Sequence, residues 1–410
     1  MAHRLSRAVQ IPAPVSPRVR KPLFETFGLA CRKTERSNRP IFAPYVNGIS
    51  TIRLSWRFGM SALRVGIIGA NAKTGWARES HIPAIQALAG LELAAVATST
   101  QETAVQAEKA FGVRAYSSGL ELANAPDIDI VTVATRVPDH RDMILAALAS
   151  GKHVYSEWPL GRGYDETEEL HMAAEAANRK TAIGLQLRGS PTVKRAKELF
   201  DGGAIGRVLS ANVYSSTAGF GPIVPEPYLY LEEPENFANL ITIQGAHTLD
   251  LISTLFGEAV VSNSLPSRQY PTIEAGQDRV VRSRTTYDHL LFHGLTEDGV
   301  SISAEVAGGR APEAPFRLEI VGEKGVLSLN GGAARGFQAD RLTLLLNNQE
   351  QRVDDGELKD LPASAINVGG IYAALRDDIV NSSSTVAGFR EALVLTKKIE
   401  AVLAAGDFTG

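Results

Sequence analysis

The first residues whose types and spacing suit chemistry are two glycines and an asparagine in one short loop. Gly69, Asn71 and Gly75 follow the apolar run 65–68 and precede a helix-like segment that begins at Trp76. Such a strand–loop–helix unit points backbone N–H groups and the positive end of a helix dipole at one spot, which suits a pyrophosphate. Asn enters the left-handed region at modest cost, so we expect Asn71 to replace the second glycine of a G-x-G-x-x-G loop. An ordinary glycine-rich βα turn has the same residue types.

Three hydroxyl residues end the second apolar run. Thr98, Ser99 and Thr100 stand where an NAD-specific site has Asp or Glu for the ribose hydroxyls. An acid would repel a 2′-phosphate, so its absence permits NADP, although no Arg is adjacent in the sequence. We expect NADP or NAD as the cofactor, with NADP favoured and dual use left open, and we expect Ser99 and Thr100 to contact it.

The segments that carry these residues alternate between apolar strands and helices. Strands are predicted over 65–68, 91–97, 129–134, 153–156 and 181–187, and helices over 82–88, 103–111, 139–150 and 164–178. Continuous apolar strands that alternate with helices are typical of a parallel, doubly wound sheet. The sequence therefore predicts an α/β fold with a Rossmann domain over residues 60–187, whose ligand binds beyond the carboxyl ends of the strands.

The pattern changes after residue 187. Short alternating segments predict strands over 208–215, 289–295, 300–306, 316–321, 325–329 and 341–345, and helices are predicted over 191–200, 237–256, 368–381 and 389–405. Strands of this kind are typical of an open, mainly antiparallel sheet. We expect an α+β substrate and oligomerisation domain over 188–410, whose last helices can pack back on the Rossmann domain.

Composition excludes several classes of protein. The chain has 410 residues, 44% of them hydrophobic, and a net charge of −3, which gives no basic face for nucleic acid or anionic lipid. No apolar run approaches the ~20 residues of a membrane span. The single cysteine, Cys31, precedes the folded part, so a disulfide or a cysteine-based metal site is excluded there. We expect a cytoplasmic protein.

Residues 1–59 differ from the rest of the chain. They are rich in Arg and Lys, contain only Glu25 and Glu35 as acids, and are interrupted by prolines. Three interpretations remain open for this segment. It is an upstream extension from a misassigned start, with Met60 as the true start, or a disordered tail, or an organelle transit peptide.

Several short motifs occur in an order and spacing that resemble one family. They are Val65-Gly-Ile-Ile-Gly69, His81-Ile-Pro-Ala84, Val133-Ala-Thr135 with His140, Gly151-Lys-His-Val154, Glu157-x-Pro159, the segment 196–206, His247-x-x-Asp250 and Gly322-Glu-Lys-Gly325. Over residues 62–405 the chain resembles the glucose–fructose oxidoreductase/inositol dehydrogenase (Gfo/Idh/MocA) family. Its departures from the wider pattern resemble the fungal galactose-regulon repressor branch. These departures are the loop with Asn71 and Gly75-Trp-Ala77, Glu157-Trp158, Leu185-Gln-x-Arg188 with Ser190-Pro191, and Asp288-His-Leu-Leu-Phe292.

The resemblance implies cofactor contacts from the loop Gly69–Gly75 with Trp76 and from the ends of two further strands. Thr135, Arg136 and His140 follow the strand 129–134, and Glu157 follows the strand 153–156. Arg136 stands where the family usually has Pro. It reaches a phosphate or the substrate, or it is an exposed arginine that leads a helix.

The lysine that the family uses in catalysis is absent. In the dehydrogenases the triplet Glu-Lys-Pro supplies a lysine that holds the substrate hydroxyl and assists proton movement, and here Trp158 stands in its place. Tryptophan donates a hydrogen bond but does not titrate. Trp158 is expected to form an aromatic wall of the cofactor or sugar site, or to be hydrophobic filling.

Histidines supply the remaining titratable candidates. The family has an Asp four residues before a His, and here these positions hold Ile243 and His247. His247 is a candidate to take or give a proton, and the alternative is a structural pair with Asp250. His289 and His293 share one face of a predicted strand without a carboxylate at ligand spacing, so we expect no metal site.

Four residues are candidate substrate contacts. Gln186 and Arg188, at the end of a strand that faces the cleft, suit substrate hydroxyls or a carboxylate. Tyr228 and Tyr230 are aromatic candidates for the cleft rim.

Two functions compete. The first is an NAD(P)-dependent oxidoreductase that acts on a sugar, polyol or related hydroxy compound by hydride transfer. The alternative is a catalytically silent NAD(P)-binding regulator or sensor, as in the repressor branch, which alone would need a protein partner. The sequence favours the enzyme, and because an open sheet needs its exposed face covered, we expect a homodimer or homotetramer.

Overall fold

The computed structural model describes residues 61–310 and 315–405. The three interpretations of residues 1–59 lie outside the described residues. Among the described helices, none has the length and apolar character that a bilayer span requires.

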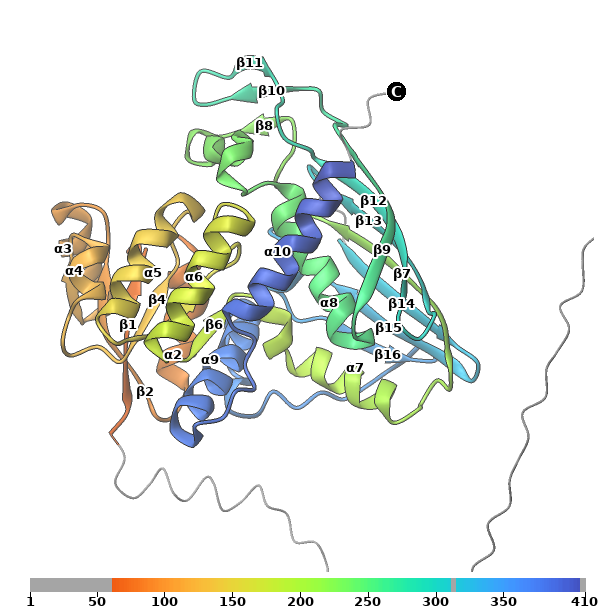
Figure 1. The fold of residues 1–410 in the computed structure, drawn as a ribbon, viewed down its shortest axis with the longest axis horizontal. Coiled ribbons are helices and arrows are strands. Elements are labelled where there is room, and N and C mark those ends of the chain that lie inside the picture. The colour runs from red at the N-terminus through yellow and green to blue at the C-terminus, as the bar shows by residue number, and fades with distance from the viewer. Residues whose placement is uncertain (1–60, 311–314, 406–410) are drawn as a thin grey trace, which may run out of the picture. The chain divides into compact units, whose positions relative to one another are not determined.

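A parallel six-stranded sheet forms the first half of the described chain, in the order β3-β2-β1-β4-β5-β6 (Figure 1). Its strands are β1 (Leu63–Ile68), β2 (Leu91–Ala97), β3 (Arg114–Tyr116), β4 (Ile130–Val133), β5 (His153–Ser156) and β6 (Thr181–Ile183). The reversal of strand order between β1 and β4 is the usual ligand site of such a sheet. The predicted doubly wound Rossmann sheet is confirmed.

Helices pack on both faces of this sheet because its strands are apolar on both sides. Val65 and Ile67 of β1 belong to one buried cluster, whereas Ile68 belongs to the other. The connecting helices are η1 (Ala77–His81), α2 (Ile82–Ala87), α3 (Gln101–Phe111), α4 (Gly119–Ala123), η2 (Val137–Asp139), α5 (His140–Ala149) and α6 (Tyr164–Ala177).

The last predicted strand of the sheet is shorter than expected. β6 ends at Ile183, and a 3-10 helix, η3 (Gln186–Gly189), occupies the rest of the range 181–187. The amide of Leu185 donates to the carbonyl of Ile183 at 2.7 Å, which is a tight turn that strand geometry does not allow. The backbone therefore turns at the carboxyl edge of the sheet, where it carries Gln186.

An eight-stranded sheet forms the second half, in the order β17-β16-β15-β14-β7-β13-β12-β9. Its strands are β7 (Val208–Ser216), β9 (Ala259–Ser267), β12 (His289–Thr296), β13 (Ser301–Ala307), β14 (Phe316–Gly322), β15 (Gly325–Gly331), β16 (Thr343–Leu346) and β17 (Gln349–Glu350). Only β7 and β13 pair in parallel, so the expected mainly antiparallel sheet is confirmed.

One face of this sheet is covered by helices and the other is open (Figure 1). The helices of this half are α7 (Pro191–Asp201), η4 (Glu226–Glu232), η5 (Pro234–Asn236), η6 (Ile241–Gly245), α8 (Ala246–Phe256), η7 (Phe337–Ala339), η8 (Gly356–Leu358), α9 (Ala363–Asn381) and α10 (Phe389–Ala404). A separate three-stranded sheet consists of β8 (Ile223–Val224), β10 (Thr272–Ala275) and β11 (Val280–Ser283), in the order β11-β10-β8. It was not predicted.

The last two helices return to the first sheet. Ile371 and Leu375 of α9 are buried in the same cluster as Val65 and Ile67 of β1. α10 packs along α6, and the amide of Ile183 donates to the carbonyl of Ala387 at 3.0 Å. The carboxyl edge of the Rossmann sheet is therefore held from both halves of the chain.

Candidate functional site

Gly69 forms a tight cradle at the carboxyl end of β1. Its φ is +99°, and a Cβ there would lie 2.5 Å from the carbonyl oxygen of Ala134. A side chain is therefore excluded both by the backbone conformation and by the neighbouring strand. Gly75 also has a positive φ, +116°, but a Cβ there would meet no atom within 4 Å. Only Gly69 needs glycine for close packing.

Asn71 stabilises the loop through its side chain. Its Oδ1 accepts hydrogen bonds from the amides of Lys73, at 2.8 Å, and Thr74, at 3.3 Å. Asn71 is not among the described residues with positive φ, so the expectation that it uses the left-handed region is wrong. An Asx turn replaces the second glycine, because the amide oxygen can satisfy two loop N–H groups.

The loop leads into a π-helical turn, η1, after Trp76. The indole Nε1 of Trp76 is buried and has no hydrogen-bond partner among the described residues. An unpaired buried donor costs about 1–3 kcal/mol, so this nitrogen suits a ligand acceptor. Together with the Gly69 cradle, it fits the expected dinucleotide.

Hydroxyls at the end of β2 are bound to one another. Thr100 caps α3, since its Oγ1 accepts from the amide of Thr103 at 3.2 Å, and the Thr103 hydroxyl donates to Thr98 Oγ1 at 2.9 Å. Ser99 is exposed. This corner keeps its hydroxyls without an acid, as the sequence indicates.

One basic residue near the loop escaped the sequence reasoning. Arg78 Nη1 donates to the carbonyl of Ala72 at 2.7 Å, and its guanidinium lies over the ring of Phe111, 5.9 Å from the centroid. Arg78 is 23 residues before Gln101 of α3, so the two are not adjacent in the sequence. Its place on the helix after the loop was the available clue.

The end of β4 carries three of the expected residues. The Oγ1 of Thr135 is buried without a partner among the described residues. The guanidinium of Arg136 lies over the ring of Tyr230, 4.9 Å from its centroid. The two halves of the chain thus meet in a cation–π contact beside the cofactor end of β4.

His140 is buried beneath this corner. Its ring nitrogens face the carbonyls of Thr135, at 3.1 Å, and Leu160, at 3.3 Å. Burial lowers the pKa of His140, and the two carbonyls offset this only in part. A neutral imidazole has one N–H, so His140 holds the backbone of Thr135 in place through a single donated bond at a time.

Glu157 is fixed at the carboxyl end of β5. Oε1 lies 3.0 Å from His81 Nε2, and Oε2 accepts from Gln186 Nε2 at 2.7 Å. The side chain is 14% exposed, whereas the imidazole of His81 is fully buried. The structure thus brings Glu157 and Gln186 together and adds His81, which the sequence offered only as part of a family motif.

Trp158 points away from Glu157 into the core. Its side chain belongs to the buried cluster between the halves, and Nε1 donates to the carbonyl of Thr242 at 2.7 Å. The residue is 6% exposed. The bond between Trp158 and Pro159 is cis.

His247 is buried at the start of α8. Burial lowers its pKa to about 3, so the imidazole is neutral at pH 7. It has no hydrogen-bond partner among the described residues, and Ile243, four residues earlier, supplies none. The expected structural pair of His247 with Asp250 does not form.

Arg188 and Asp250 bind each other instead. Arg188 Nε donates to Oδ1 at 2.9 Å, and Nη2 lies 2.7 Å from the same oxygen. Burial raises the pKa of Asp250 although the Arg188 guanidinium opposes the shift. This pair lines a hollow between α8 and α10 with Arg390 and Lys398, so Arg188 is separated from Gln186.

The expected rim tyrosines lie on η4. Tyr228 is 51% exposed, whereas Tyr230 is half-buried, and burial raises its pKa. The segment is held by Arg284, whose fully buried guanidinium contacts Glu232 at 3.0 Å and Asp288 at 2.6 Å. This cluster was not predicted, because Glu232 is 52 residues from Arg284 in the sequence.

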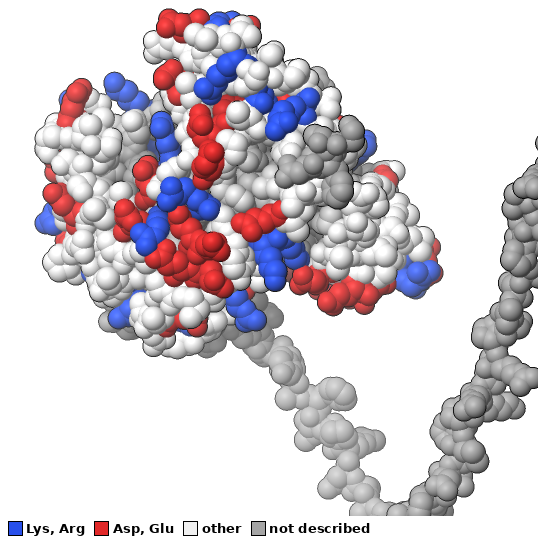
Figure 2. Space-filling model, turned by 45° about the horizontal axis from the view of Figure 1, so that its top comes forward, with Lys and Arg blue, Asp and Glu red and all other residues white. Residues whose placement is uncertain are grey.

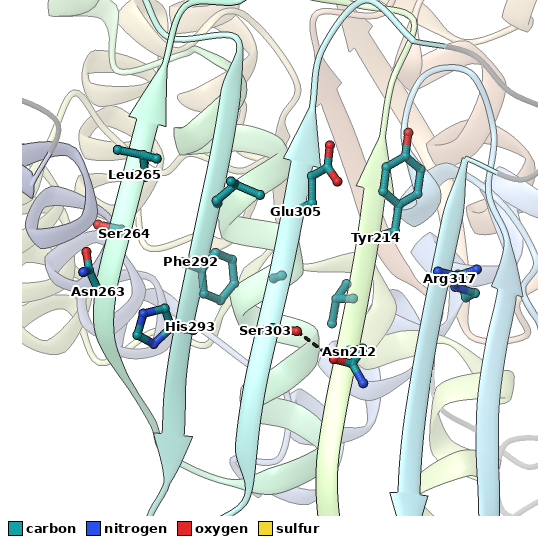
Figure 3. A pocket seen from close by; sticks show the side chains of 13 residues that line it. Asn212, Tyr214, Asn263, Ser264, Leu265, Phe292, His293, Ser303, Glu305 and Arg317 are labelled. Carbon is teal, nitrogen blue, oxygen red and sulfur yellow. Dashed lines mark hydrogen bonds between the residues drawn. The ribbon is translucent and has the colours of Figure 1, made fainter.

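The open face of the eight-stranded sheet is hollowed (Figure 3). The hollow has a volume of about 610 Å³ and is lined by polar and apolar side chains of β7, β9, β12, β13 and β14. His293 points into it, whereas His289 contacts Glu305 Oε1 at 3.1 Å. In the described ranges no group of three His, Cys, Asp or Glu side chains could hold a metal ion.

Two family models match the chain in succession. The model of an oxidoreductase family with an NAD-binding Rossmann fold, GFO_IDH_MocA, matches residues 63–185. The model of the Gal80p C-terminal domain matches residues 191–331.

Similar proteins include regulators and a dehydrogenase. The galactose/lactose metabolism regulatory protein GAL80 of Saccharomyces cerevisiae is 30% identical over 333 residues, 75% of each chain. The GAL80 protein of Kluyveromyces lactis is 29% identical over 296 residues. The match covers 66% of the present chain and 64% of the length of that protein. Dehydrogenase aclE of Aspergillus oryzae is 27% identical over 359 residues, 84% of this chain and 96% of that protein.

Solved structures agree with this arrangement. A super-repressor mutant of Gal80p from Saccharomyces cerevisiae has a TM-score of 0.75 at 26% identity and covers 85% of this chain and 97% of its own. Levoglucosan dehydrogenase in complex with NADH has a TM-score of 0.70 at 22% identity, with 84% and 97% covered, which is a likeness of fold.

A glycine cradle at the switch point of a parallel sheet, followed by an open mixed sheet, defines an oxidoreductase-type protein with an NAD-binding Rossmann fold. The chain belongs to the Gfo/Idh/MocA family, near its Gal80-like branch. Both regulators and sugar or inositol dehydrogenases are among its relatives.

Proposed function

We propose that this protein binds NADP or NAD at the carboxyl edge of the Rossmann sheet and oxidises or reduces a sugar, polyol or related hydroxy compound. The observation that carries the proposal is the intact cradle, in which Gly69 has a φ of +99° and no room for a side chain. Gly75, Asn71 and the unpaired indole nitrogen of Trp76 complete the loop that would hold the pyrophosphate and its neighbours.

The preference for NADP is part of the same proposal. No acid stands at Thr98, Ser99 or Thr100, and Arg78, bound to the carbonyl of Ala72 and lying over the ring of Phe111 of α3, is a basic residue beside the loop. A cation there would favour a 2′-phosphate. Arg78→Ala is expected to raise the Kd for NADP more than the Kd for NAD, measured by quenching of tryptophan fluorescence.

The bound nicotinamide would supply a hydride acceptor or donor, and the chain's own side chains would orient the substrate. Gln186 has a buried amide oxygen without a partner among the described residues. His247 is neutral and would offer a hydrogen bond, while Tyr230 and Arg136 would border the rim. The Arg188–Asp250 pair would support η3, which carries Gln186.

One experiment tests the proposal. The full chain is titrated with NADP(H) and NAD(H) by tryptophan fluorescence, and the absorbance of the reduced cofactor is then followed across a panel of sugars and polyols. Turnover that depends on one substrate class is the expected result. Tight binding without turnover on any substrate would overturn the enzymatic proposal.

A second candidate, a cofactor-binding regulator or sensor, is favoured by one observation. Trp158 is bound to the carbonyl of Thr242, and Ile243 stands at the family's Asp position, so both usual catalytic groups are replaced by side chains that do not titrate. Such a protein would use the same cleft and would need a protein partner. Activity gained by Trp158→Lys in an otherwise silent protein would support it.

We also propose that two copies pair through the open sheet face, in the cytoplasm. Leu291 of β12 and Leu265 of β9 are opposite each other in register, and they are 42% and 61% exposed. Exposed apolar side chains around a hollow are typical of an interface. On the face in Figure 2, basic and acidic side chains are interspersed rather than gathered in one basic patch, which suits a protein or sugar better than nucleic acid.

A further inference from the structure

The carboxylate of Glu157 lies in a small site formed by His81, Gln186 and Gly184. His81 and Gln186 bind its two oxygens, at 3.0 and 2.7 Å. A Cβ on Gly184 would lie 2.8 Å from Oε1 and 2.9 Å from Oε2, so glycine leaves the space that the carboxylate fills. The head group is thus fixed in position while 14% of the side chain remains exposed.

A series of hydrogen bonds continues from this site into the core. His81 Nδ1 lies 2.9 Å from the hydroxyl of Tyr372, and that hydroxyl lies 2.8 Å from Thr132 Oγ1. His81, Tyr372 and Thr132 have no exposed surface. Of the four linked groups, therefore, only Glu157 reaches solvent.

The linked side chains can form their hydrogen bonds with two different arrangements of protons. With Glu157 ionised, His81 donates from Nε2 to the carboxylate and accepts at Nδ1 from the Tyr372 hydroxyl. With Glu157 protonated, the carboxyl donates to Nε2, and His81 in its other tautomer donates from Nδ1 to Tyr372, which donates to Thr132. Both forms leave every member paired, so adding a proton to Glu157 breaks no hydrogen bond on balance.

Of the groups that move the proton in this family, the lysine and the aspartate are replaced here, by Trp158 and Ile243. Trp158 follows Glu157 directly but is turned into the core toward Thr242. His247 is neutral, and its buried imidazole has no partner that would stabilise a charge among the described residues. Tyr155, whose ring packs 5.1 Å from that of His81, is itself fully buried. Glu157 is the titratable member of this neighbourhood with an exposed edge at the carboxyl end of the sheet.

We propose that Glu157 is the catalytic proton acceptor and donor of this protein, and that His81 and Tyr372 are positioning residues that accommodate its change of protonation. The proposal rests on the proposed oxidoreductase function. In oxidation, the substrate C–H bond breaks and its electron pair passes with the hydrogen to the oxidised dinucleotide. The O–H bond breaks, its proton passes to Glu157, and the C=O bond forms. Reduction is the reverse, and solvent restores the starting protonation at the exposed edge.

Cofactor binding tests the position of the charge without any substrate. Oxidised nicotinamide carries a positive charge that the reduced form lacks, so a nearby carboxylate favours the oxidised form. The ratio of the Kd for NADP+ to the Kd for NADPH is measured by fluorescence at one fixed pH in the full chain, in Glu157→Gln and in Glu169→Gln. Glu169 is a surface carboxylate paired with Arg141 and serves as the matched control.

We expect the ratio to be the same in the wild type and in Glu169→Gln, and to rise about fivefold in Glu157→Gln, because the carboxylate charge is removed. An unchanged ratio in Glu157→Gln overturns the proposal. Gly184→Ala provides a second variant, because its methyl displaces the carboxylate without removing it. It is expected to change the ratio in the same direction, and a folded Gly184→Ala protein with the wild-type ratio also counts against the proposal.

Kinetics then separate this assignment from the proposed function. With a turned-over substrate, Glu157→Gln is expected to lower kcat about 10²- to 10⁴-fold with little change in KM, and Tyr372→Phe to shift the pH profile of kcat. Turnover unaffected by Glu157→Gln overturns the role of Glu157 alone. Turnover absent in the wild type on every substrate overturns the proposed function, and the catalytic role with it, even where the binding ratio still responds to Glu157.

Discussion

The indole nitrogen of Trp158 donates a hydrogen bond of 2.7 Å to the main-chain carbonyl of Thr242. Thr242 lies in η6, a π-helical turn, and the side chain of Trp158 thereby joins the end of β5 to the helix that carries His247. π-turns are frequent at functional sites because they redirect backbone groups. At this position the protein has a hydrogen-bonded contact between its two halves in place of a titratable side chain.

Trp158→Phe tests this contact. The change removes the donor and leaves a buried carbonyl unpaired, so the free energy of unfolding should fall by about 1–3 kcal/mol. Urea unfolding followed by circular dichroism measures the loss. The Kd for the cofactor should stay within about twofold, and a large loss of affinity would instead indicate that the indole is a wall of the cofactor site.

Gly69→Ala and Gly75→Ala form a matched pair in the cofactor loop. Both have positive φ, but only the Gly69 variant pushes a methyl against a carbonyl, 2.5 Å away. Gly75→Ala should cost about 1–3 kcal/mol of backbone strain and keep measurable cofactor binding. Gly69→Ala should lose binding, measured by fluorescence titration, and equal behaviour of the two variants would contradict the cradle.

Arg284→Met should be strongly destabilising. Its guanidinium is fully buried against Glu232 and Asp288, whose carboxylates would be left without their cation. Breaking a buried pair in this way costs about 3–5 kcal/mol. Arg279→Met on the same hairpin is the control, because the ion pair of Arg279 with Glu274 is 63% and 43% exposed and should contribute less than about 1 kcal/mol. Thermal unfolding of the two variants gives the comparison.

His247 should make the protein less stable in acid. Its ordinary pKa is 6.5, and burial lowers the pKa to about 3 in the folded state, so the unfolded chain takes up the proton first as the pH falls. Stability that is complete above about pH 6.5 is therefore lost between that pH and about 3, by as much as about 1.4 kcal/mol per pH unit.

Denaturant unfolding from pH 7 to pH 4 measures this loss. His247→Leu should flatten the acid side of the curve, whereas His171→Leu, at a half-buried position on α6, should leave it parallel to the wild type. An acid side that is equally steep in His247→Leu and in the wild type would show that this imidazole does not resist protonation.

Leu291→Asp should dissociate the proposed dimer. It places a charge opposite Leu265, on the two strands β12 and β9 at one end of the open sheet face. Size-exclusion chromatography with light scattering measures the mass. Val105→Asp, at an equally apolar position on α3 that is 55% exposed, should leave the assembly unchanged, and a wild-type chain that is monomeric at micromolar concentration would rule the pairing out.

Much of the fold could be predicted because hydrophobic periodicity is a local signal. β2 and β5 have the predicted bounds, since each is a short, mostly buried segment rich in apolar and aromatic residues between helices. β9 and the hairpin of β10 and β11 were missed. β9 and β11 carry Ser, Asn, Pro or Arg among their residues, and β10 and β11 are only four residues long, so neither pattern predicts a strand.

The candidate site was predictable only in part. The loop at Gly69 and the ends of β4 and β5 follow from the rule that ligands bind at the carboxyl ends of parallel strands. The pairing of Arg188 with Asp250 and the link of Glu157 through His81 to Tyr372 depend on tertiary packing across 62 and 291 residues. Local sequence patterns do not indicate which of several charged or polar residues will pair with a given side chain in the folded protein.

The helix α9 has a consequence for synthesis. Tyr372, Ile371 and Leu375 complete the buried cluster under β1, and the hydroxyl of Tyr372 contacts His81 and Thr132. On the ribosome, the amino-terminal sheet emerges first but lacks this covering until nearly the whole chain has been translated. Its early strands must wait, partly uncovered, for the last helices, so this half should be the chaperone-dependent part of the nascent protein.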